Sequence, residues 1–143
     1  MATAASSIDI HRSVADVWRL VADLGATPRW RTTLTEVVPP AALAPGARFT
    51  ATTRLLGRSW RWLLEVTAVE TERLLAYRVV EGFTSLAVEY RLEPLGDGCR
   101  FTLTGSSTPR RLVERALEPV AAGALRRQSR RHLENLRGIL EGR

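Results

Sequence analysis

The sequence predicts an α+β fold in which a curved antiparallel β-sheet is wrapped around one long C-terminal α-helix, with two short helices after the first strand. Three observations predict this fold. A strand-like segment followed by two short helical segments stands at the start. Segments in which apolar and polar residues alternate, separated by turn residues, fill the middle. A long segment with apolar residues at helical spacing closes the chain.

The two short helices are predicted from their end signals. Ser13 is a good N-cap, because its hydroxyl can accept a hydrogen bond from the backbone N–H near Asp16 in a capping box. We expect this first helix to end near Leu24-Gly25, since glycine tolerates the left-handed conformation that ends helices. Thr27-Pro28 then fits the cap and first position of a second short helix that carries Trp30.

The strands are predicted from runs of β-formers bounded by turn residues. They cover residues 8–10, 34–38, 48–56, 59–69, 74–80, 86–93 and 100–104. The segment Leu95-Gly96-Asp97-Gly98 between the last two runs is a strong hairpin signal. A series of hairpins implies an antiparallel sheet with one face covered and the other in water.

The two-residue period assigns the covered face of the sheet. Apart from Thr53, its members are apolar or aromatic. The covered face comprises Phe49, Ala51, Thr53, Leu55, Trp60, Trp62, Leu64, Val66, Leu75, Tyr77, Val79, Leu86, Val88, Tyr90, Leu92, Phe101 and Leu103. On this assignment the covered face holds no Asp, Glu, Lys or Arg. Arg54 and Arg78 fall on the opposite phase, so we expect both at the surface.

The last element is predicted as one long helix that covers the sheet. Thr108-Pro109 fits a helix start, and apolar residues then recur at helical spacing. Pro119 inside this segment is expected to kink the helix or to split off its first turns. Further on, His132 falls on the apolar stripe, whereas Arg126, Arg127, Arg130 and Arg137 fall on the opposite side.

A motif near the start resembles a known superfamily. The pattern Ser-x-x-x-Val-Trp-x-Leu-x-x-Asp, followed by Pro-x-Trp, stands here as Ser13, Val17, Trp18, Leu20, Asp23, Pro28 and Trp30. With the strand spacing and the long last helix, the chain resembles the SRPBCC or START-like helix-grip superfamily, which includes the polyketide cyclase/dehydrase family. The resemblance covers nearly the whole chain, so we expect one domain over residues 1–143. It implies a helix-grip fold with a ligand cavity between the sheet and the C-terminal helix.

The resemblance implies that the chain binds a hydrophobic or aromatic small molecule, lipid- or polyketide-like, in that cavity. The residues expected at the ligand are Trp30, Trp60, Trp62, Tyr77, Val88, Tyr90, Phe101 and His132. By the family pattern, Arg29 and Trp30 border the cavity entrance, where Trp30 either caps the core or walls the ligand. Arg31 at the mouth is a candidate partner for an acidic group of the ligand.

Two other functions stay open at this point. The first is a polyketide cyclase/dehydratase-type enzyme that uses Tyr77, Tyr90 and His132 as proton donors. The poverty of titratable groups on the covered face, which holds no Asp, Glu, Lys or Arg, counts against it, because general acid–base catalysis needs a group of suitable pKa within reach of the substrate. No catalytic residue is therefore assigned. The second is an interaction protein that uses the Arg-rich surface of the last helix.

The charge and the apolar content of the chain limit the kinds of partner that we expect. All 21 basic residues are arginine, the formal net charge is +6, and +5 of it falls from Arg110 onward. No aromatic residues alternate with those arginines as on nucleic-acid stacking platforms, so we expect no nucleic acid. No apolar run approaches the roughly 20 residues that span a bilayer, so no stable membrane insertion is expected. The chain is expected to act as a monomer or homodimer.

Metal and cofactor sites are not predicted. No pair among His11, Cys99, His132 and the carboxylates has the spacing of a recognised metal motif, and no glycine-rich phosphate loop is present. We therefore expect neither a metal nor a cofactor. The single cysteine, Cys99, cannot form an internal disulfide, and no secretory signal begins the chain, which favours a reducing cytoplasmic location.

Overall fold

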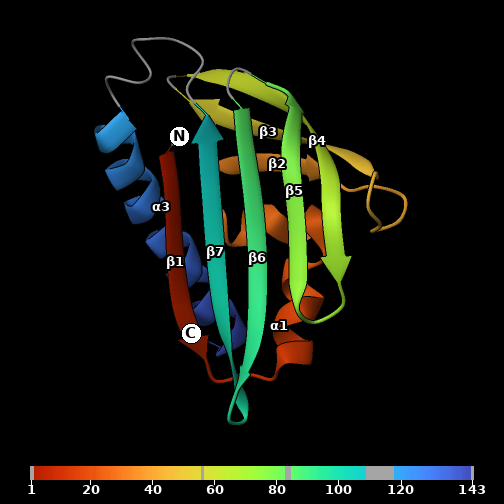
Figure 1. The fold of residues 1–143 in the computed structure, drawn as a ribbon, viewed down its shortest axis with the longest axis vertical. Coiled ribbons are helices and arrows are strands. Elements are labelled where there is room, and N and C mark those ends of the chain that lie inside the picture. Colours follow the sequence, from red (N-terminus) through yellow and green to blue (C-terminus); the bar gives the residue numbers. More distant parts are fainter. Residues whose placement is uncertain (1, 56, 83–84, 109–117, 143) are drawn as a thin grey trace.

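The computed structural model describes residues 2–55, 57–82, 85–108 and 118–142. Seven strands form one antiparallel sheet in the order β1-β7-β6-β5-β4-β3-β2, so the first and last strands of the chain are neighbours (Figure 1). The strands are β1 (Ala2–Ile10), β2 (Leu34–Val38), β3 (Arg48–Leu55), β4 (Arg58–Glu70), β5 (Leu74–Glu81), β6 (Ser85–Leu95) and β7 (Gly98–Thr108).

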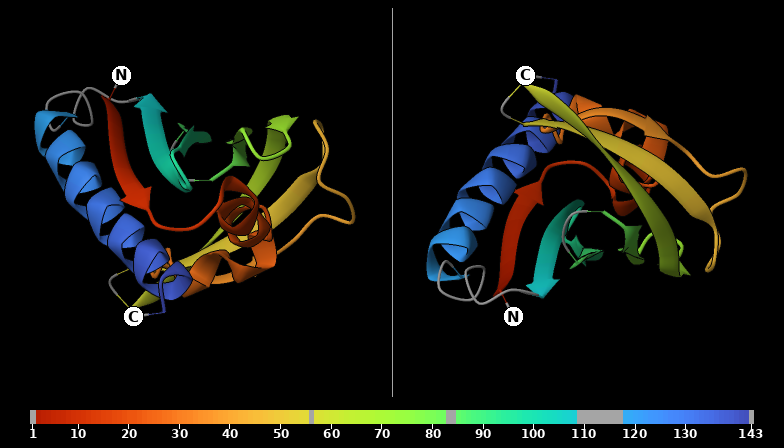
Figure 2. Two further views of the ribbon diagram at one scale, coloured as in Figure 1. Left: turned by 90° about the horizontal axis from the view of Figure 1, so that it is seen from below. Right: turned by 90° about the horizontal axis from the view of Figure 1, so that it is seen from above.

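Within the described ranges, three helical elements lie on the concave side of this sheet. They are α1 (Val14–Val21), the 3₁₀ helix η1 (Leu24–Arg29) and α3 (Glu118–Leu140). Figure 2 shows the sheet curled into a half-barrel, with α3 running along β1 and with η1 beside the C-terminal part of α3, where Asn135 donates to the Trp30 carbonyl. This is the helix-grip arrangement, and the predicted fold class is confirmed.

The start of α1 is the predicted one, but its end is not. The Asp16 backbone N–H donates to the Ser13 hydroxyl at 3.2 Å, as an N-cap requires, and the Asp16 carboxylate accepts from Arg12 at 3.0 Å. The helix ends at Val21, so the predicted end near Leu24-Gly25 is wrong. The Ala22 N–H already closes the last turn, and the chain then tightens into η1.

The second short helix begins earlier than predicted. It starts at Leu24, so Thr27 and Pro28 lie inside it and do not form its cap and first position. The Thr27 hydroxyl donates to the Leu24 carbonyl at 2.7 Å and thereby stabilises the turn from within. Both corrections have one cause. A 3₁₀ helix shares few sequence signals with an α-helix, and its i→i+3 bonds let it begin directly after α1.

The predicted strands are present, and several are longer than their patterns indicate. β2 has the predicted bounds, whereas β1 begins at Ala2 and β7 reaches Thr108. These extensions pair with each other in register, from Ala2 opposite Ser107 to Ile10 opposite Cys99. They consist largely of Ala, Ser, Thr and Gly, whose polarity does not alternate, so the backbone pairing extends beyond any side-chain signal. The predicted hairpin turn carries Gly96 at a φ of 58°.

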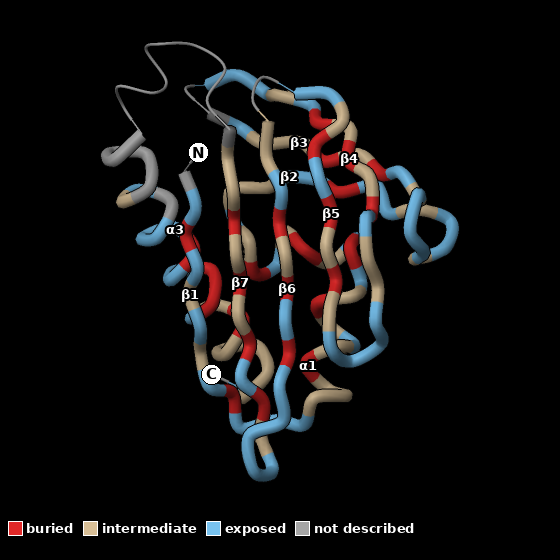
Figure 3. Tube along the Cα trace, viewed as in Figure 1, coloured by how far each residue is buried: buried red, intermediate tan, exposed pale blue. Residues whose placement is uncertain are grey.

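The covered face of the sheet is the predicted one. Buried side chains follow the two-residue period along the central strands, as Figure 3 shows. Trp30 lies in the middle of the core and meets Tyr90 and Phe101 edge-on, at ring-centroid distances of 5.5 and 5.9 Å. Trp30 therefore joins the short-helix segment to the sheet.

The last helix is described only from Glu118. The predicted helix start at Thr108-Pro109 lies at the end of β7 and in residues 109–117, which are outside the described residues. Pro119 is the second described residue of α3. The predicted kink concerns the helix on both sides of Pro119 and stays a prediction. Within the described ranges, no helix is both long and apolar enough to cross a membrane.

Two glycines differ in the space that a side chain would have, and this difference predicts the effects of their substitution by alanine. A Cβ at Gly98 would lie 2.5 Å from the Ile10 backbone oxygen, so Gly98→Ala must push the two strands apart. We expect a loss of roughly 1–3 kcal/mol of unfolding free energy in urea denaturation. Gly123 in α3 has open space around it, so Gly123→Ala should be neutral or stabilising by about 0.5–1 kcal/mol. Equal effects of the two substitutions would contradict the close approach of β1 at Gly98.

Candidate functional site

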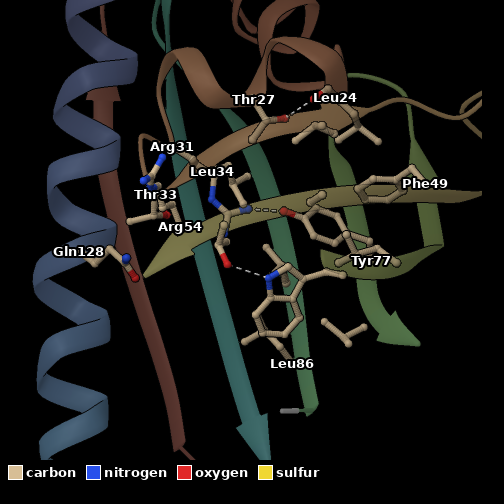
Figure 4. Close-up of a pocket in the computed structure, with 17 residues that line it drawn as sticks. Leu24, Thr27, Arg31, Thr33, Leu34, Phe49, Arg54, Tyr77, Leu86 and Gln128 are labelled. Carbon is tan, nitrogen blue, oxygen red and sulfur yellow. Dashed lines mark hydrogen bonds between the residues drawn. The ribbon is translucent and has the colours of Figure 1, made fainter. Parts of the chain in front are cut away.

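A cavity of about 270 Å³ lies between the concave face of β3–β6 and the segment formed by η1 and β2 (Figure 4). We call it the β3–β6 cavity. Its wall is mostly apolar, with a few polar groups among the aliphatic and aromatic side chains. The lining residues are Leu24, Thr27, Arg31, Thr33, Leu34, Val37, Phe49, Ala51, Thr53, Arg54, Trp62, Leu64, Tyr77, Val79, Leu86, Val88 and Gln128.

The principal polar group of the wall is a cluster of Arg31, Tyr77 and Tyr90. Nη1 of Arg31 donates to the Tyr77 hydroxyl and, at 3.2 Å, to the Tyr90 hydroxyl. The two hydroxyl oxygens are 2.9 Å apart and share a further hydrogen bond. Figure 4 draws the hydrogen bond from the Arg31 guanidinium to the Tyr77 hydroxyl as a dashed line. The segment that follows η1 thus brings a cation onto the apolar face of the sheet.

The charge of Arg31 is not balanced by an acid in the described part of the chain. None of the ion pairs there includes Arg31, and its Nε is buried without a hydrogen-bond partner. Burial works to lower the pKa of Arg31, but the oxygens of Tyr77 and Tyr90 outweigh it and the pKa lies above its ordinary value. The guanidinium is therefore charged at any physiological pH.

Tyr90 is a neutral phenol in this cluster. Burial first, and then the neighbouring Tyr77, raise the pKa of Tyr90 well above its ordinary value, although Arg31 opposes the shift. Tyr90 is fully buried and does not line the cavity, whereas Tyr77 does. Tyr77 is thus the phenol that a bound molecule would meet.

The structure divides the eight predicted ligand residues into two groups. Trp62, Tyr77 and Val88 line the β3–β6 cavity. The indole N–H of Trp62 donates to the Thr53 hydroxyl at 3.0 Å, which fixes the ring against the wall. The other five are elsewhere in the fold: Trp30, Trp60, Tyr90, Phe101 and His132.

Each of those five has a local reason for its position. Trp30, Tyr90 and Phe101 pack on one another behind the cavity wall. Trp60 is half-buried at the start of β4. The Arg58 guanidinium lies over its ring, 5.6 Å from the ring centroid. His132 is 3% exposed on α3. Position on the covered face therefore identifies buried side chains, but it does not separate those that fill the core from those that border the cavity.

Two arginines differ from their predicted positions. Arg31 was expected at the mouth, and its guanidinium instead donates to Tyr77 in the cavity wall and to Tyr90 behind it. Arg54 was expected on the outer surface; it is exposed, yet its side chain also lines the cavity. The last residue of β3 that pairs with β2 is Thr53, opposite Leu34. Beyond that pair the sheet edge is open, so the long Arg54 side chain can reach over it. Arg78 is at the surface as predicted, paired with Glu65 at 2.8 Å.

The remaining lining residues were not predicted as site residues, although a signal existed for some of them. Phe49, Ala51 and Thr53 belong to the predicted covered face, so alternation could have assigned them to the site. The residues of η1 and β2 carry no pattern that points inward, because their position depends on how the segment folds back over the sheet. Among the described residues, no three His, Cys, Asp or Glu side chains lie together as a metal site would need.

The cavity wall offers little acid–base chemistry. Among the described residues that line it, the ionisable side chains are Arg31, Arg54 and Tyr77. His132 is not one of them, and its environment holds it neutral. Burial first, then the charges of Arg31 and Arg131, lower the pKa of His132 to about 4. A histidine with this pKa is a neutral imidazole near neutral pH, which is a poor general acid for a cyclase-type mechanism.

The Arg-rich surface of α3 is present and lies apart from the cavity. Arg126, Arg127, Arg130 and Arg137 border a groove between α3 and β1, together with Glu134. The first three are exposed. The groove and the β3–β6 cavity share no lining residue among those that the structure describes.

Comparisons with known proteins bear on both fold and family. A family model described as "Polyketide cyclase / dehydrase and lipid transport" matches residues 1–141. No curated protein sequence shows significant similarity to the chain. Among solved structures, TTHA0849 from Thermus thermophilus superposes with a TM-score of 0.80 at 17% identity, over 98% of this chain and 97% of that one.

Two further structures show the same fold. A START superfamily protein from Mycobacterium smegmatis has a TM-score of 0.79 at 13% identity, over 98% of this chain and 97% of that chain. DynU16, a protein of the dynemicin biosynthetic locus, has a TM-score of 0.73 at 18% identity, over 99% of this chain and 48% of its own. At these identities the likeness is one of fold alone.

The environment of His132 predicts a pH-dependent stability. The unfolded chain binds a proton at His132 below about pH 6.5, and the folded chain only below about pH 4. Stability is thus fully present above pH 6.5 and falls as the pH falls toward 4. Between pH 7 and pH 5 the wild type should lose about 2 kcal/mol more unfolding free energy than His132→Leu does.

Urea denaturation at both pH values measures this difference. His11→Gln, a substitution of the exposed histidine, serves as the control and should keep the wild-type dependence. If His132→Leu loses as much stability between pH 7 and pH 5 as the wild type, then His132 is not held neutral by its burial.

Proposed function

Because the chain belongs to the polyketide cyclase/dehydrase and lipid transport family, we propose that it binds one hydrophobic or aromatic small molecule in the β3–β6 cavity. The observation that carries this proposal is the cavity itself, an apolar space walled by four strands and closed by η1 and β2. Its wall carries few polar groups, Arg31 and Tyr77 among them, a composition typical of sites that bind by burial and orient by a small number of hydrogen bonds.

The size of the cavity limits the ligand. At about 270 Å³ it is at the small end of ligand pockets, which span roughly 300–1,000 Å³. This favours a compact ring system or a short chain. Removing about 200 Å² of apolar ligand surface from water would contribute about 5 kcal/mol at about 25 cal/mol per Å². Loss of translational and rotational freedom on association reduces that gain.

Binding is a better account of the cavity than catalysis. A cyclase or dehydratase moves protons, and the described residues of the cavity wall include no carboxyl or imidazole group to do so. Tyr77 and Arg31 can polarise a carbonyl oxygen, but neither accepts a proton readily at neutral pH.

We place the protein in the cytoplasm, because its lone cysteine, Cys99, is buried and free.

A cavity-filling substitution tests the proposal. Ala51 lines the cavity, so Ala51→Phe should fill it and weaken binding of N-phenyl-1-naphthylamine, a neutral apolar fluorophore, at least tenfold, about 1.4 kcal/mol. Ala87 is exposed on β6, outside the lining of the cavity, and Ala87→Phe is the matched control, with an expected change of less than about twofold. A fluorophore that binds wild type and Ala51→Phe equally well would contradict the proposal.

A further inference from the structure

We propose that the ligand of the β3–β6 cavity is a hydrophobic carboxylic acid, whose carboxylate is bound by Arg31 and Tyr77. This inference rests on the proposed function and adds the chemical class of the ligand to it. It follows from three features of the Arg31 cluster: how its hydrogens are used, what balances its charge, and which of its members face the cavity.

A count of the polar hydrogens leaves one phenol hydrogen without an acceptor. The two hydrogens on Nη1 of Arg31 go to the Tyr77 and Tyr90 oxygens, and one phenol hydrogen lies between those oxygens. If Tyr77 donated to Tyr90, the Tyr90 hydrogen would be left in a fully buried place where no described residue accepts it. Tyr90 therefore donates to Tyr77. The Tyr77 hydrogen is then available to an acceptor in the cavity, which Tyr77 lines.

Arg31 has donors of its own left over. Its hydrogen bonds to described residues all come from Nη1, and Nε is buried without a partner. A buried donor without an acceptor costs about 1–3 kcal/mol, so its survival needs an explanation. A guanidinium presents paired N–H groups that match the two oxygens of a carboxylate. An acceptor in the cavity beside the Arg31–Tyr77 pair would accept from the unused hydrogens of both.

The unpaired positive charge of Arg31, like its unused hydrogens, favours a ligand with a carboxylate. Arg31 lies on a mostly apolar wall, and no carboxylate of the described residues pairs with it. A cation taken out of water without a counter-charge is costly, on the order of several kcal/mol. A ligand carboxylate would supply that counter-charge where the protein does not. The apolar remainder of the acid would lie against the Phe49, Leu64 and Val88 side chains.

Calorimetry with matched pairs of probes tests this inference. The pairs are benzoate and benzamide, 2-naphthoate and 2-naphthamide, and 2-anthracenecarboxylate with its amide, each pair differing in charge but not in ring system. We expect at least one carboxylate to bind wild type about tenfold tighter than its amide. Arg31→Met should abolish that preference and retain binding of N-phenyl-1-naphthylamine.

Charge-matched variants separate Arg31 from the overall positive charge. Arg29→Gln removes one cation from an exposed position on η1 and should keep the preference for the acid within about twofold. Tyr77→Phe removes the phenol hydrogen and leaves the cation in place. It should lower the affinity of the best acid about fivefold without changing fluorophore binding, and it serves as the second variant if Arg31→Met does not fold.

Each outcome decides one of the two claims. Equal affinity for acids and amides, or a preference that survives in Arg31→Met, would overturn the inference and leave the proposed function intact. A fluorophore and probes that all fail to bind would overturn the proposed function and the inference together. A preference lost equally in Arg29→Gln and Arg31→Met would assign it to net charge and overturn the role of Arg31.

Discussion

The structure depends on a mismatch of width between the sheet and the helix that covers it. Seven strands at about 4.8 Å spacing extend across roughly 29 Å, whereas one helix with its side chains is about 10–12 Å wide. In the described part of the chain α3 packs chiefly on β1. The other half of the concave face is left to α1 and η1, which are too short to fill it. The β3–β6 cavity is what remains.

The same geometry explains the position of the charge. The segment after η1 must cross the open half of the sheet to reach β2, and Arg31 is the residue that meets the tyrosines of β5 and β6 there. In a filled core such a cation would be a defect. Beside a cavity it becomes a recognition group, because the low polarity of the wall strengthens any interaction with an anion that enters. The fold thus supplies the apolar volume, and one arginine supplies its selectivity.

The sequence predicted the fold well, because fold depends on patterns that a single chain displays. Alternation assigned the covered face of the sheet correctly, and the Ser13 cap and the Gly96 turn gave element boundaries. The site was predicted in part. Alternation identifies Tyr77 and Tyr90 as buried but cannot say which of them reaches the cavity, since that depends on where α3 and η1 rest. Arg54 is exposed as predicted, but its reach into the cavity was not foreseen, because it depends on the open sheet edge beside the start of β2.

The most direct measurement is a crystal structure of the protein with the tightest-binding acid of the aromatic series. The account predicts the ring system inside the β3–β6 cavity and a carboxylate oxygen within about 3 Å of both the Arg31 guanidinium and the Tyr77 hydroxyl. Rings outside the cavity, or a carboxylate directed to solvent with Arg31 still bound only to Tyr77 and Tyr90, would contradict it.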